Sequence, residues 1–337
     1  MDPNSAPIPT TARALLQQDP ASPTLILTTL PVPHPTPSSN EHLLRVHALA
    51  LCNGELHWPK NFPPADPGAK TLVPGYDVTG TVVLAPPSSP FRPGDEVYAR
   101  TKYAHTGCAR DYTIAVTEEL ARRPKRLSWV ESAAVALSAQ SAWQALFVHA
   151  GLGDDVDSGL AVGKRVLVTG ASGGVGVWVV QLARLAGADV VGVCGSRNAD
   201  MVAALGAGEV LDYRTTSLQD WARDERKMAD VVIDCSGRKA LEDAWWTVRD
   251  GGVLISIVQP PELVRPYGCS EKKVRNCFFI MQPNGAQLGR ITELVDAGKC
   301  HPVVDSVWRF EDFEKAYERA DGGQAVGKVV LDLMMGL

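Results

Sequence analysis

A short strand, a glycine-rich turn and a helix follow one another without a gap in the middle of the chain. The β-branched run Arg165–Thr169 leads into the turn, and a mostly apolar stretch continues over 177–186. Glycines at such a turn let a pyrophosphate reach the backbone N–H groups at the start of the helix. The order of strand, glycine-rich turn and helix predicts a dinucleotide site in a βαβ unit. The alternative is a glycine-rich turn in a doubly wound domain that binds no nucleotide. The turn residues expected at the phosphates are Gly170, Ala171, Ser172, Gly173, Gly174, Val175 and Gly176.

The end of the next expected strand indicates which dinucleotide binds. Enzymes that use NAD usually place an acidic residue there for the ribose hydroxyls, whereas this chain has Ser196, Arg197 and Asn198. A carboxylate would repel a 2′-phosphate, while a hydroxyl and a guanidinium bind it through charge-assisted hydrogen bonds. We therefore expect NADPH rather than NADH. The alternative is that Arg197 is a solvated surface residue.

Strand and helix patterns divide the chain into two regions. A Pro-rich stretch of about forty residues predicts an extended edge piece with a turn, and short alternating runs from His42 onward predict a partly open β-barrel. The Ser-x-x-Glu pattern of 128–131 is typical of a capping box at a helix start. Strands and helices then alternate, which predicts a parallel sheet with crossover helices. The tail adds a helix, the segment Val303–Phe310, another helix and a last strand, Gly327–Leu333.

Composition and charge exclude several classes of protein. Asp and Glu (38) outnumber Lys and Arg (33), and no long basic run offers a surface for nucleic acid. No apolar stretch approaches the roughly 18–20 residues that a membrane helix needs. The N-terminal residues lack a secretory signal, so we expect a cytoplasmic protein. The seven cysteines are scattered without metal or redox spacing, which favours reduced thiols.

Several motifs in this order resemble the medium-chain dehydrogenase/reductases, and in particular their zinc-independent quinone-oxidoreductase and enoyl-reductase branch. The resemblance covers nearly the whole chain. The motifs are Val73–Gly80 (Pro-Gly-x-Asp-x-x-Gly), Phe91–Val97 (with Gly-Asp-x-Val), Ala133–Leu146, Leu205–Ala207, Asp212–Arg214 and Gly327–Val330. The resemblance implies an α/β protein with a GroES-like β-barrel catalytic domain from 1–127 and 285–337. It also implies a Rossmann doubly wound parallel-sheet domain for NADPH over 128–284. The stretch 53–59 is similar to that of fungal members, often found in secondary metabolism.

The resemblance also bears on metal binding. Zinc-dependent alcohol dehydrogenases of the same superfamily take a ligand from a Gly-His-Glu segment, where this chain has Tyr76 and Asp77. Cys52 falls near the first ligand position, but one thiolate cannot hold a tetrahedral ion alone. Only Cys108 lies where those enzymes carry four cysteines for a structural zinc. We therefore expect no metal, with a zinc-type alcohol dehydrogenase as the alternative.

By resemblance, the reaction is hydride transfer from NADPH to the activated C=C of an enone, quinone or unsaturated thioester. The segment 52–58 is expected to line the substrate cleft, with Cys52 and Trp58 against the substrate and Asn53 or His57 as a proton donor. Tyr76 is a second donor candidate. The plain alternatives are that Asn53 is a turn residue, that His57 is a surface side chain, and that Cys52, Trp58 and Tyr76 are core residues. Phe279 belongs to an irregular segment, 260–285, whose aromatic residues cover the substrate mouth or form a dimer contact.

Further cofactor contacts are implied by the resemblance. They are Ser141 near the nicotinamide, Lys328 near the cofactor, Tyr213 near the adenosine phosphate, and Cys235, Ser236, Ile257 and Val258 at strand ends. Ligands of open α/β sheets bind at the carboxyl ends of the strands, which independently supports the last four. The alternatives are a helix-surface serine at 141, a tyrosine that only covers the sheet edge, and a solvated lysine at 328.

The expected partner is a small-molecule substrate, with a polyketide-like or carrier-bound acyl group as one form of it. Nucleic acid and membrane are not expected, and a homodimer is compatible with the resemblance. A third function stays open, in which a non-redox biosynthetic enzyme retains the dinucleotide pocket, because a fold does not fix a function.

Overall fold

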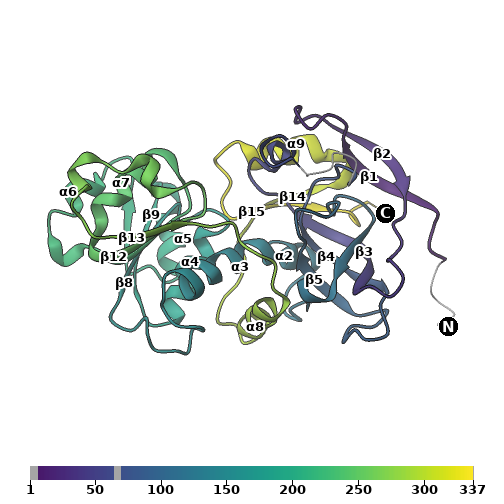
Figure 1. Cartoon of the computed structure of the whole chain (residues 1–337), viewed down its shortest axis with the longest axis horizontal. Coiled ribbons are helices and arrows are strands. Elements are labelled where there is room, and N and C mark those ends of the chain that lie inside the picture. The colour runs from purple at the N-terminus through teal and green to yellow at the C-terminus, as the bar shows by residue number, and fades with distance from the viewer. Residues whose placement is uncertain (1–6, 64–69, 337) are drawn as a thin grey trace. The chain divides into compact units, whose positions relative to one another are not determined.

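The computed structural model describes residues 7–63 and 70–336. The chain forms two compact units, shown in Figure 1. Unit 1 comprises Met1–Ala136, Pro283–Thr292 and Val304–Leu337, and unit 2 comprises Leu137–Gln282 and Glu293–Val303. Residues 128–136 thus belong with the first unit and 293–303 with the second, whereas the sequence prediction placed both the other way.

Unit 1 is built on a mainly antiparallel sheet. In the described part of the chain this sheet has seven strands in the order β14-β15-β3-β4-β5-β7, and β6 pairs with β3. The strands are β3 (Glu41–Ala50), β4 (Asp77–Leu84), β5 (Glu96–Arg100), β6 (Tyr112–Val116), β7 (Leu120–Arg122), β14 (Val304–Arg309) and β15 (Lys328–Asp332). Because β15 pairs with β3, the last strand of the chain completes a sheet that starts near residue 41.

The Pro-rich N-terminal stretch is extended with a turn, as the sequence predicts, and it forms a two-stranded antiparallel sheet of its own. β1 (Thr11–Gln17) pairs with β2 (Leu25–Pro31), and both are purple in Figure 1. Pro31 is the last residue of β2, where its missing N–H costs no central ladder bond. Three helices accompany the sheet of unit 1 in the described residues. They are α1 (Trp58–Asn61), α2 (Trp129–Ala133) and α9 (Phe313–Asp321).

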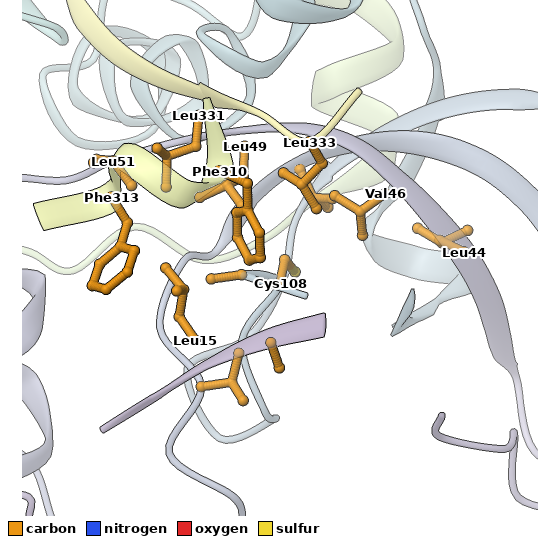
Figure 2. Close-up of a cluster of buried hydrophobic side chains, with 14 of the residues drawn as sticks. Leu15, Leu44, Val46, Leu49, Leu51, Cys108, Phe310, Phe313, Leu331 and Leu333 are labelled. Atoms are coloured by element: carbon orange, nitrogen blue, oxygen red, sulfur yellow. The ribbon is translucent and has the colours of Figure 1, made fainter. Parts of the chain in front are cut away.

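The core of unit 1 joins the two ends of the chain. Figure 2 shows Leu15 from β1, Leu49 from β3 and Leu331 from β15 turned toward the rings of Phe310 and Phe313. Four of these side chains are fully buried or nearly so, and Phe313 is 8% exposed. Burial of an aliphatic or aromatic side chain of this size contributes about 1.5–3 kcal/mol. The apolar core therefore holds the C-terminal segment to the N-terminal half.

Helix α2 begins at the predicted capping box. The Ser128 hydroxyl accepts a hydrogen bond from the N–H of Glu131 at 3.2 Å, and the Glu131 carboxylate accepts one from the N–H of Ser128 at 2.8 Å. The two bonds satisfy donors that a helix start otherwise leaves unpaired. Ala133 then packs with Ala48 and Val330 of the sheet, which explains why α2 belongs to unit 1.

Unit 2 is a doubly wound parallel sheet. Within the described residues it has six strands in the order β10-β9-β8-β11-β12-β13, all parallel. The strands are β8 (Arg165–Thr169), β9 (Asp189–Cys194), β10 (Glu209–Asp212), β11 (Ala229–Asp234), β12 (Val248–Ser256) and β13 (Arg275–Phe278). The order reverses between β8 and β11, which is the switch point where such sheets bind ligands. Sequence reasoning did not find β13, which lies in the irregular 260–285 segment.

The crossover helices of unit 2 are α4 (Gly176–Leu185), α5 (Ala199–Ala204), α6 (Leu218–Trp221) and α7 (Arg238–Thr247). Two further helices, α3 (Ala136–Trp143) and α8 (Gly285–Asp296), span boundaries between the units, and α3 runs into a π-helical turn over Gln144–His149. In the part of the chain that the structure describes, no helix has the length and apolarity needed to cross a membrane.

Replacing Ser128 by Ala removes the side-chain acceptor of the capping box. We expect the free energy of unfolding to fall by about 1 kcal/mol, because the N–H of Glu131 loses its partner at the helix start. Thermal unfolding followed by circular dichroism measures the change, with Ser128→Thr as the control that keeps a hydroxyl. A Ser128→Ala midpoint equal to that of the unmodified protein would contradict this role of the box.

Candidate functional site

The glycine turn after β8 allows close backbone packing. A Cβ atom on Gly170, whose φ is 62°, would lie 2.5 Å from the Ser236 Oγ atom. A Cβ atom on Gly176 would lie 2.1 Å from the Gly170 carbonyl oxygen, so neither position tolerates a side chain. At Gly173 the nearest atom would be 3.3 Å away, so this glycine leaves its outer side open for a ligand.

Helix α4 begins with unsatisfied donors. The N–H groups of Gly174, Val175 and Gly176 make no hydrogen bond to any described residue. Unpaired N–H groups at a helix start, together with the helix dipole, favour an anion such as a pyrophosphate. Asn198, another predicted cofactor residue, lies beside the turn. Its side-chain amide donates to the hydroxyl of the turn residue Ser172 at 3.0 Å. These contacts fit a dinucleotide at the turn.

Two cationic side chains come from the ends of β9 and β10. Ser196 and Arg197 are exposed and begin a 3-10 turn directly after β9. Arg214 and Tyr213 approach Gly195, the residue between β9 and this turn. A Cβ atom placed on Gly195 would lie 3.8 Å from the Arg214 guanidinium carbon and 3.7 Å from the Tyr213 ring. Sequence reasoning missed Arg214 as a site residue, although it is two positions beyond the end of β10.

One acidic group shares this edge of the sheet. The Asp212 carboxylate accepts hydrogen bonds from the N–H of Arg214 and from Ser196, and these bonds lower the pKa of Asp212. The negative charge of Asp212 would repel a bound phosphate. Arg197 and Arg214 are the basic side chains that this edge offers to a phosphate.

A buried carboxylate fixes the strand ends at the switch point. Asp234 accepts hydrogen bonds from the hydroxyls of Thr169 at 2.6 Å and Ser256 at 2.8 Å. It also accepts from the N–H groups of Ser236 at 3.2 Å and Gly237 at 3.0 Å. The ends of β8, β11 and β12 are therefore tied together. Sequence reasoning missed Asp234, whose signal is an acidic residue at the end of an apolar strand before Cys-Ser-Gly.

Four predicted cofactor residues lie at the strand ends that Asp234 ties together. Cys235 donates its N–H to the Thr169 hydroxyl, and Ile257 donates its N–H to the Asp234 carbonyl at 3.1 Å. Ser236 and Val258 are exposed beside them. Cys235, Ser236, Ile257 and Val258 thus meet at the carboxyl edge of the sheet, as expected for cofactor contacts.

Two other predicted residues lie elsewhere in unit 2. Ser141 is buried in α3, where its hydroxyl donates to the Leu137 carbonyl at 2.8 Å. The ring of Phe279 is 9% exposed and lies 4.2 Å from the ring of His149 between centroids. Their roles at a nicotinamide and at a substrate mouth stay predictions.

Unit 1 holds five buried ionisable side chains that act on one another electrostatically, which we call the buried ionic cluster. It consists of Cys52, Glu55, Asp77, Tyr317 and Lys328, and each is at most 8% exposed. The Lys328 Nζ atom lies 3.3 Å from the Cys52 sulfur and 3.2 Å from an Asp77 carboxylate oxygen. The Tyr317 hydroxyl donates to the Glu55 Oε1 atom at 2.8 Å. The alternative of a solvated Lys328 is wrong, and its predicted cofactor contact stays untested.

The protonation states of this cluster follow from its burial. Burial raises the pKa of the Cys52 thiol to about 12 and that of Glu55 to about 8, so both are mainly neutral at pH 7. Burial alone would lower the pKa of Lys328, but Cys52 and Asp77 raise it above its usual value. The Glu55 Oε2 atom has no hydrogen-bond partner among the described residues, as suits a protonated carboxyl. The persistent charges are therefore the Lys328 ammonium and the Asp77 carboxylate.

An aromatic group lies around the predicted donor Tyr76. The Trp58 ring stacks on the Tyr76 ring with centroids 5.6 Å apart, and the Tyr103 ring is 5.4 Å away. The Lys70 ammonium donates to the Tyr76 hydroxyl at 3.2 Å. Sequence reasoning missed Lys70 and Tyr103, since nothing in the local pattern relates them to Tyr76.

The other two donor candidates are closer to the surface. The Asn53 amide is exposed and donates to the Ala320 carbonyl at 3.1 Å, at the end of α9. His57 is exposed in the single turn before α1. Their catalytic roles stay predictions.

Comparisons with known proteins match both units. A family model described as "Alcohol dehydrogenase GroES-like domain" matches residues 38–125, and one described as "Zinc-binding dehydrogenase" matches residues 205–331. The "Probable zinc-binding oxidoreductase, mitochondrial" of Arthroderma benhamiae is 51% identical over 329 residues, which cover 97% of this chain and 98% of that relative. The chain belongs to the medium-chain dehydrogenase/reductase family.

Two further members support the predicted branch and fold. The "Quinone-oxidoreductase QR1, chloroplastic" of Triphysaria versicolor is 31% identical over 318 residues, which cover 89% of this chain and 92% of that protein. A crystal structure of an NAD-dependent alcohol dehydrogenase has a TM-score of 0.83 at 27% identity and covers 95% of this chain and 99% of that one. The chain is thus an oxidoreductase with the alcohol dehydrogenase-like fold, and a nicotinamide cofactor is supported.

The names of these family members correct one expectation. We expected a cytoplasmic protein from the N-terminal sequence, but the A. benhamiae relative is named mitochondrial and the T. versicolor relative chloroplastic. Both names point to organelles, so the cytoplasmic expectation is wrong. The similarity of 53–59 to fungal members stays a prediction.

Some family names include zinc, so the fit of a zinc ion can be tested on the residues. Zinc sites in proteins use three or four Cys, His or carboxylate ligands. Among the described residues, no three such side chains are grouped so that they could hold a metal ion. At Cys52 the Lys328 ammonium already lies against the sulfur, and its charge would oppose a second cation. The buried ionic cluster does not fit zinc.

Replacing Lys328 by Met removes the ammonium and keeps most of the stem. We expect the free energy of unfolding to fall by about 3–5 kcal/mol, because the Asp77 carboxylate loses its buried counter-charge. The double variant with Asp77→Asn should recover part of this loss. Denaturant unfolding of the four proteins in this cycle measures both effects, with Lys125→Met at the surface as the control. Equal midpoints for Lys328→Met and Lys125→Met would refute the importance of the pair.

Proposed function

We propose that this chain is an NADPH-dependent, zinc-independent reductase that acts on an activated C=C bond of an enone, quinone or unsaturated thioester. The observation that carries the proposal is the Lys328 ammonium between Cys52 and Asp77. It supplies the positive charge that a metal would otherwise bring to this part of unit 1. Without a metal, the substrate must be polarised by hydrogen bonds from the protein.

The chemistry of the cofactor fits this reaction. Bound NADPH supplies a hydride to an electron-poor carbon. The chain positions the dinucleotide with the open glycine turn at Gly173 and the free N–H groups at the start of α4. The hydrogen bonds to Asp234 fix the strand ends at which a bound nicotinamide would lie. Negative charge then develops on the substrate carbonyl oxygen, and a hydroxyl such as that of Tyr76 is suited to stabilise and protonate it.

The preference for NADPH rests on the charges at the ends of β9 and β10. Arg197 and Arg214 provide two guanidinium groups, and the carboxylate of Asp212 lies at the same edge. A guanidinium binds a phosphate through two parallel charge-assisted hydrogen bonds. A 2′-phosphate would therefore gain more from the two cations than it loses from Asp212.

The proposal is tested by following cofactor oxidation in the purified protein with a panel of enones, quinones and unsaturated thioesters. We expect turnover with NADPH, slower turnover with NADH, and unchanged rates after treatment with a strong chelator. Loss of activity on chelation, with recovery on adding zinc, would instead identify a zinc enzyme. Tight NADPH binding without oxidation by any acceptor would favour a non-redox role.

Replacing Arg214 by Ala tests the preference for NADPH without requiring turnover. We expect the Kd for NADPH to rise about tenfold or more, because a charge-assisted bond to the phosphate contributes about 1.5–3 kcal/mol. The Kd for NADH should change less than about twofold, because NADH lacks that phosphate. Fluorescence titration measures both constants, with Arg223→Ala on the same unit as the control. Equal weakening of both cofactors would contradict the assignment.

A further inference from the structure

Lys70 lies among aromatic rings of unit 1. Its ammonium is 3.2 Å from the Tyr76 hydroxyl oxygen and 3.6 Å from the centroid of the Tyr103 ring. It also donates to the carbonyl oxygens of Tyr103 and His105. The three hydrogen bonds use all the donors of an ammonium group. Lys70 is therefore held in one place with its charge against two phenol rings.

The direction of the bond to Tyr76 follows from the chemistry of the groups. An ammonium can only donate, so the Tyr76 oxygen accepts this bond and keeps its own proton. Among the described residues, that proton has no acceptor. The Tyr103 hydroxyl is likewise buried without a hydrogen-bond partner in the described residues. Among the described residues, the hydroxyl protons of Tyr76 and Tyr103 thus have no acceptor, which a substrate oxygen would provide.

The charge states keep Tyr76 as a donor. Burial raises the pKa of Tyr76 above its usual value, so the phenol stays protonated across the neutral range. Burial, followed by the charge of Arg100, lowers the pKa of Lys70 to about 8. The other titratable groups that act on Tyr76 are Tyr103, Glu55 and Cys108. As the pH rises through about 8, the Lys70 side chain loses the proton that it shares with this group.

The shape of the group favours a flat ligand. Tyr76 is buried at 3% exposure, whereas Trp58, Lys70 and Tyr103 are each partly exposed. The Trp58 and Tyr76 rings are nearly parallel, at 28° between their planes. Aromatic faces bind a planar conjugated ring better than a flexible acyl chain, because stacking adds to the burial of apolar surface. A ring with a carbonyl oxygen on its edge would satisfy both the stacking surface and the donors.

We propose that Tyr76 and Lys70 form a proton-donating pair for a quinone-class substrate that stacks on Trp58. The proposal rests on the proposed function and names its substrate class. Tyr76 is the catalytic acid and Lys70 a positioning residue. Hydride from NADPH adds to a ring carbon of the quinone, one carbonyl oxygen takes a proton from Tyr76, and solvent moves the proton of that ring carbon to the second oxygen. The overall reaction converts a quinone, NADPH and one proton to a hydroquinone and NADP⁺. The O–H bond of Tyr76 breaks as an O–H bond forms on the substrate oxygen. The Lys70 ammonium stabilises the Tyr76 phenolate through its hydrogen bond, and water returns a proton to the Tyr76 oxygen.

The first test compares kcat and KM for a naphthoquinone and for an acyclic enone between about pH 6 and about pH 10. For Tyr76→Phe, which keeps the ring, we expect kcat with the naphthoquinone to fall about 100-fold, as for loss of a general acid. For Lys70→Met we expect about a tenfold fall at neutral pH and loss of the decline that the unmodified protein shows above pH about 8. Lys70→Arg, which stays charged, should keep the neutral rate and also lose that decline.

Lys102→Met is the matched control, since Lys102 is exposed one position before Tyr103. Its rates and pH profile should equal those of the unmodified protein. Thermal unfolding of each variant identifies any loss that comes from misfolding, and Lys70→Arg then provides the folded comparison. A Tyr76→Phe variant that is folded and retains kcat within about twofold would overturn the role of Tyr76 as acid.

A second test needs no turnover and therefore separates this proposal from the proposed function. The probe is para-nitrophenol, a planar phenol whose ionised form absorbs visible light. Bound next to the Lys70 ammonium, it should ionise at a lower pH than in solution, and Lys70→Met should abolish this shift. If the shift is present but no acceptor oxidises NADPH, the proposed function fails and the donor pair stands. If NADPH is oxidised but the probe shows no shift, the donor pair is refuted.

Discussion

The ion pair between Lys328 and Asp77 is the contact on which the structure of unit 1 depends. A lone ammonium in the protein interior would lose several kcal/mol of solvation, so it requires an anion in contact with it. Asp77 at 3.2 Å meets that need and comes from β4, whereas Lys328 begins β15 at the other end of the chain. The pair therefore joins the C-terminal strand to the N-terminal sheet. It also places a fixed positive charge against Cys52.

Unit 2 uses a buried carboxylate for a related purpose. Among the residues that the structure describes, Asp234 has no basic partner and is satisfied by two hydroxyls and two backbone N–H groups. Such a carboxylate is stable in the interior only while all these donors stay in place. The ends of β8, β11 and β12 are thus held together by the need to solvate one charge. In both units, a single buried acid fixes the local geometry from which binding and chemistry follow.

Local features of the fold were predictable from the sequence, and long-range contacts were not. The glycine turn at Gly170, the capping box at Ser128 and the parallel sheet of unit 2 are each encoded within a few neighbouring residues, and the structure confirms them. The partners of Lys328 are more than 250 residues away, and no periodicity relates them. Lys70 and Arg214 were missed for the same reason, because a lone cation in a loop resembles a solvated residue until its neighbours are known.

The central claim is that a side-chain ammonium, and no metal ion, provides the positive charge beside Cys52. The most direct measurement is a crystal structure of the purified protein with NADPH, with diffraction data collected on both sides of the zinc absorption edge. The account predicts no anomalous peak at the Cys52 sulfur, with the Lys328 Nζ atom in contact with both Cys52 and Asp77. An anomalous peak within bonding distance of Cys52, with Lys328 displaced from it, would contradict the account.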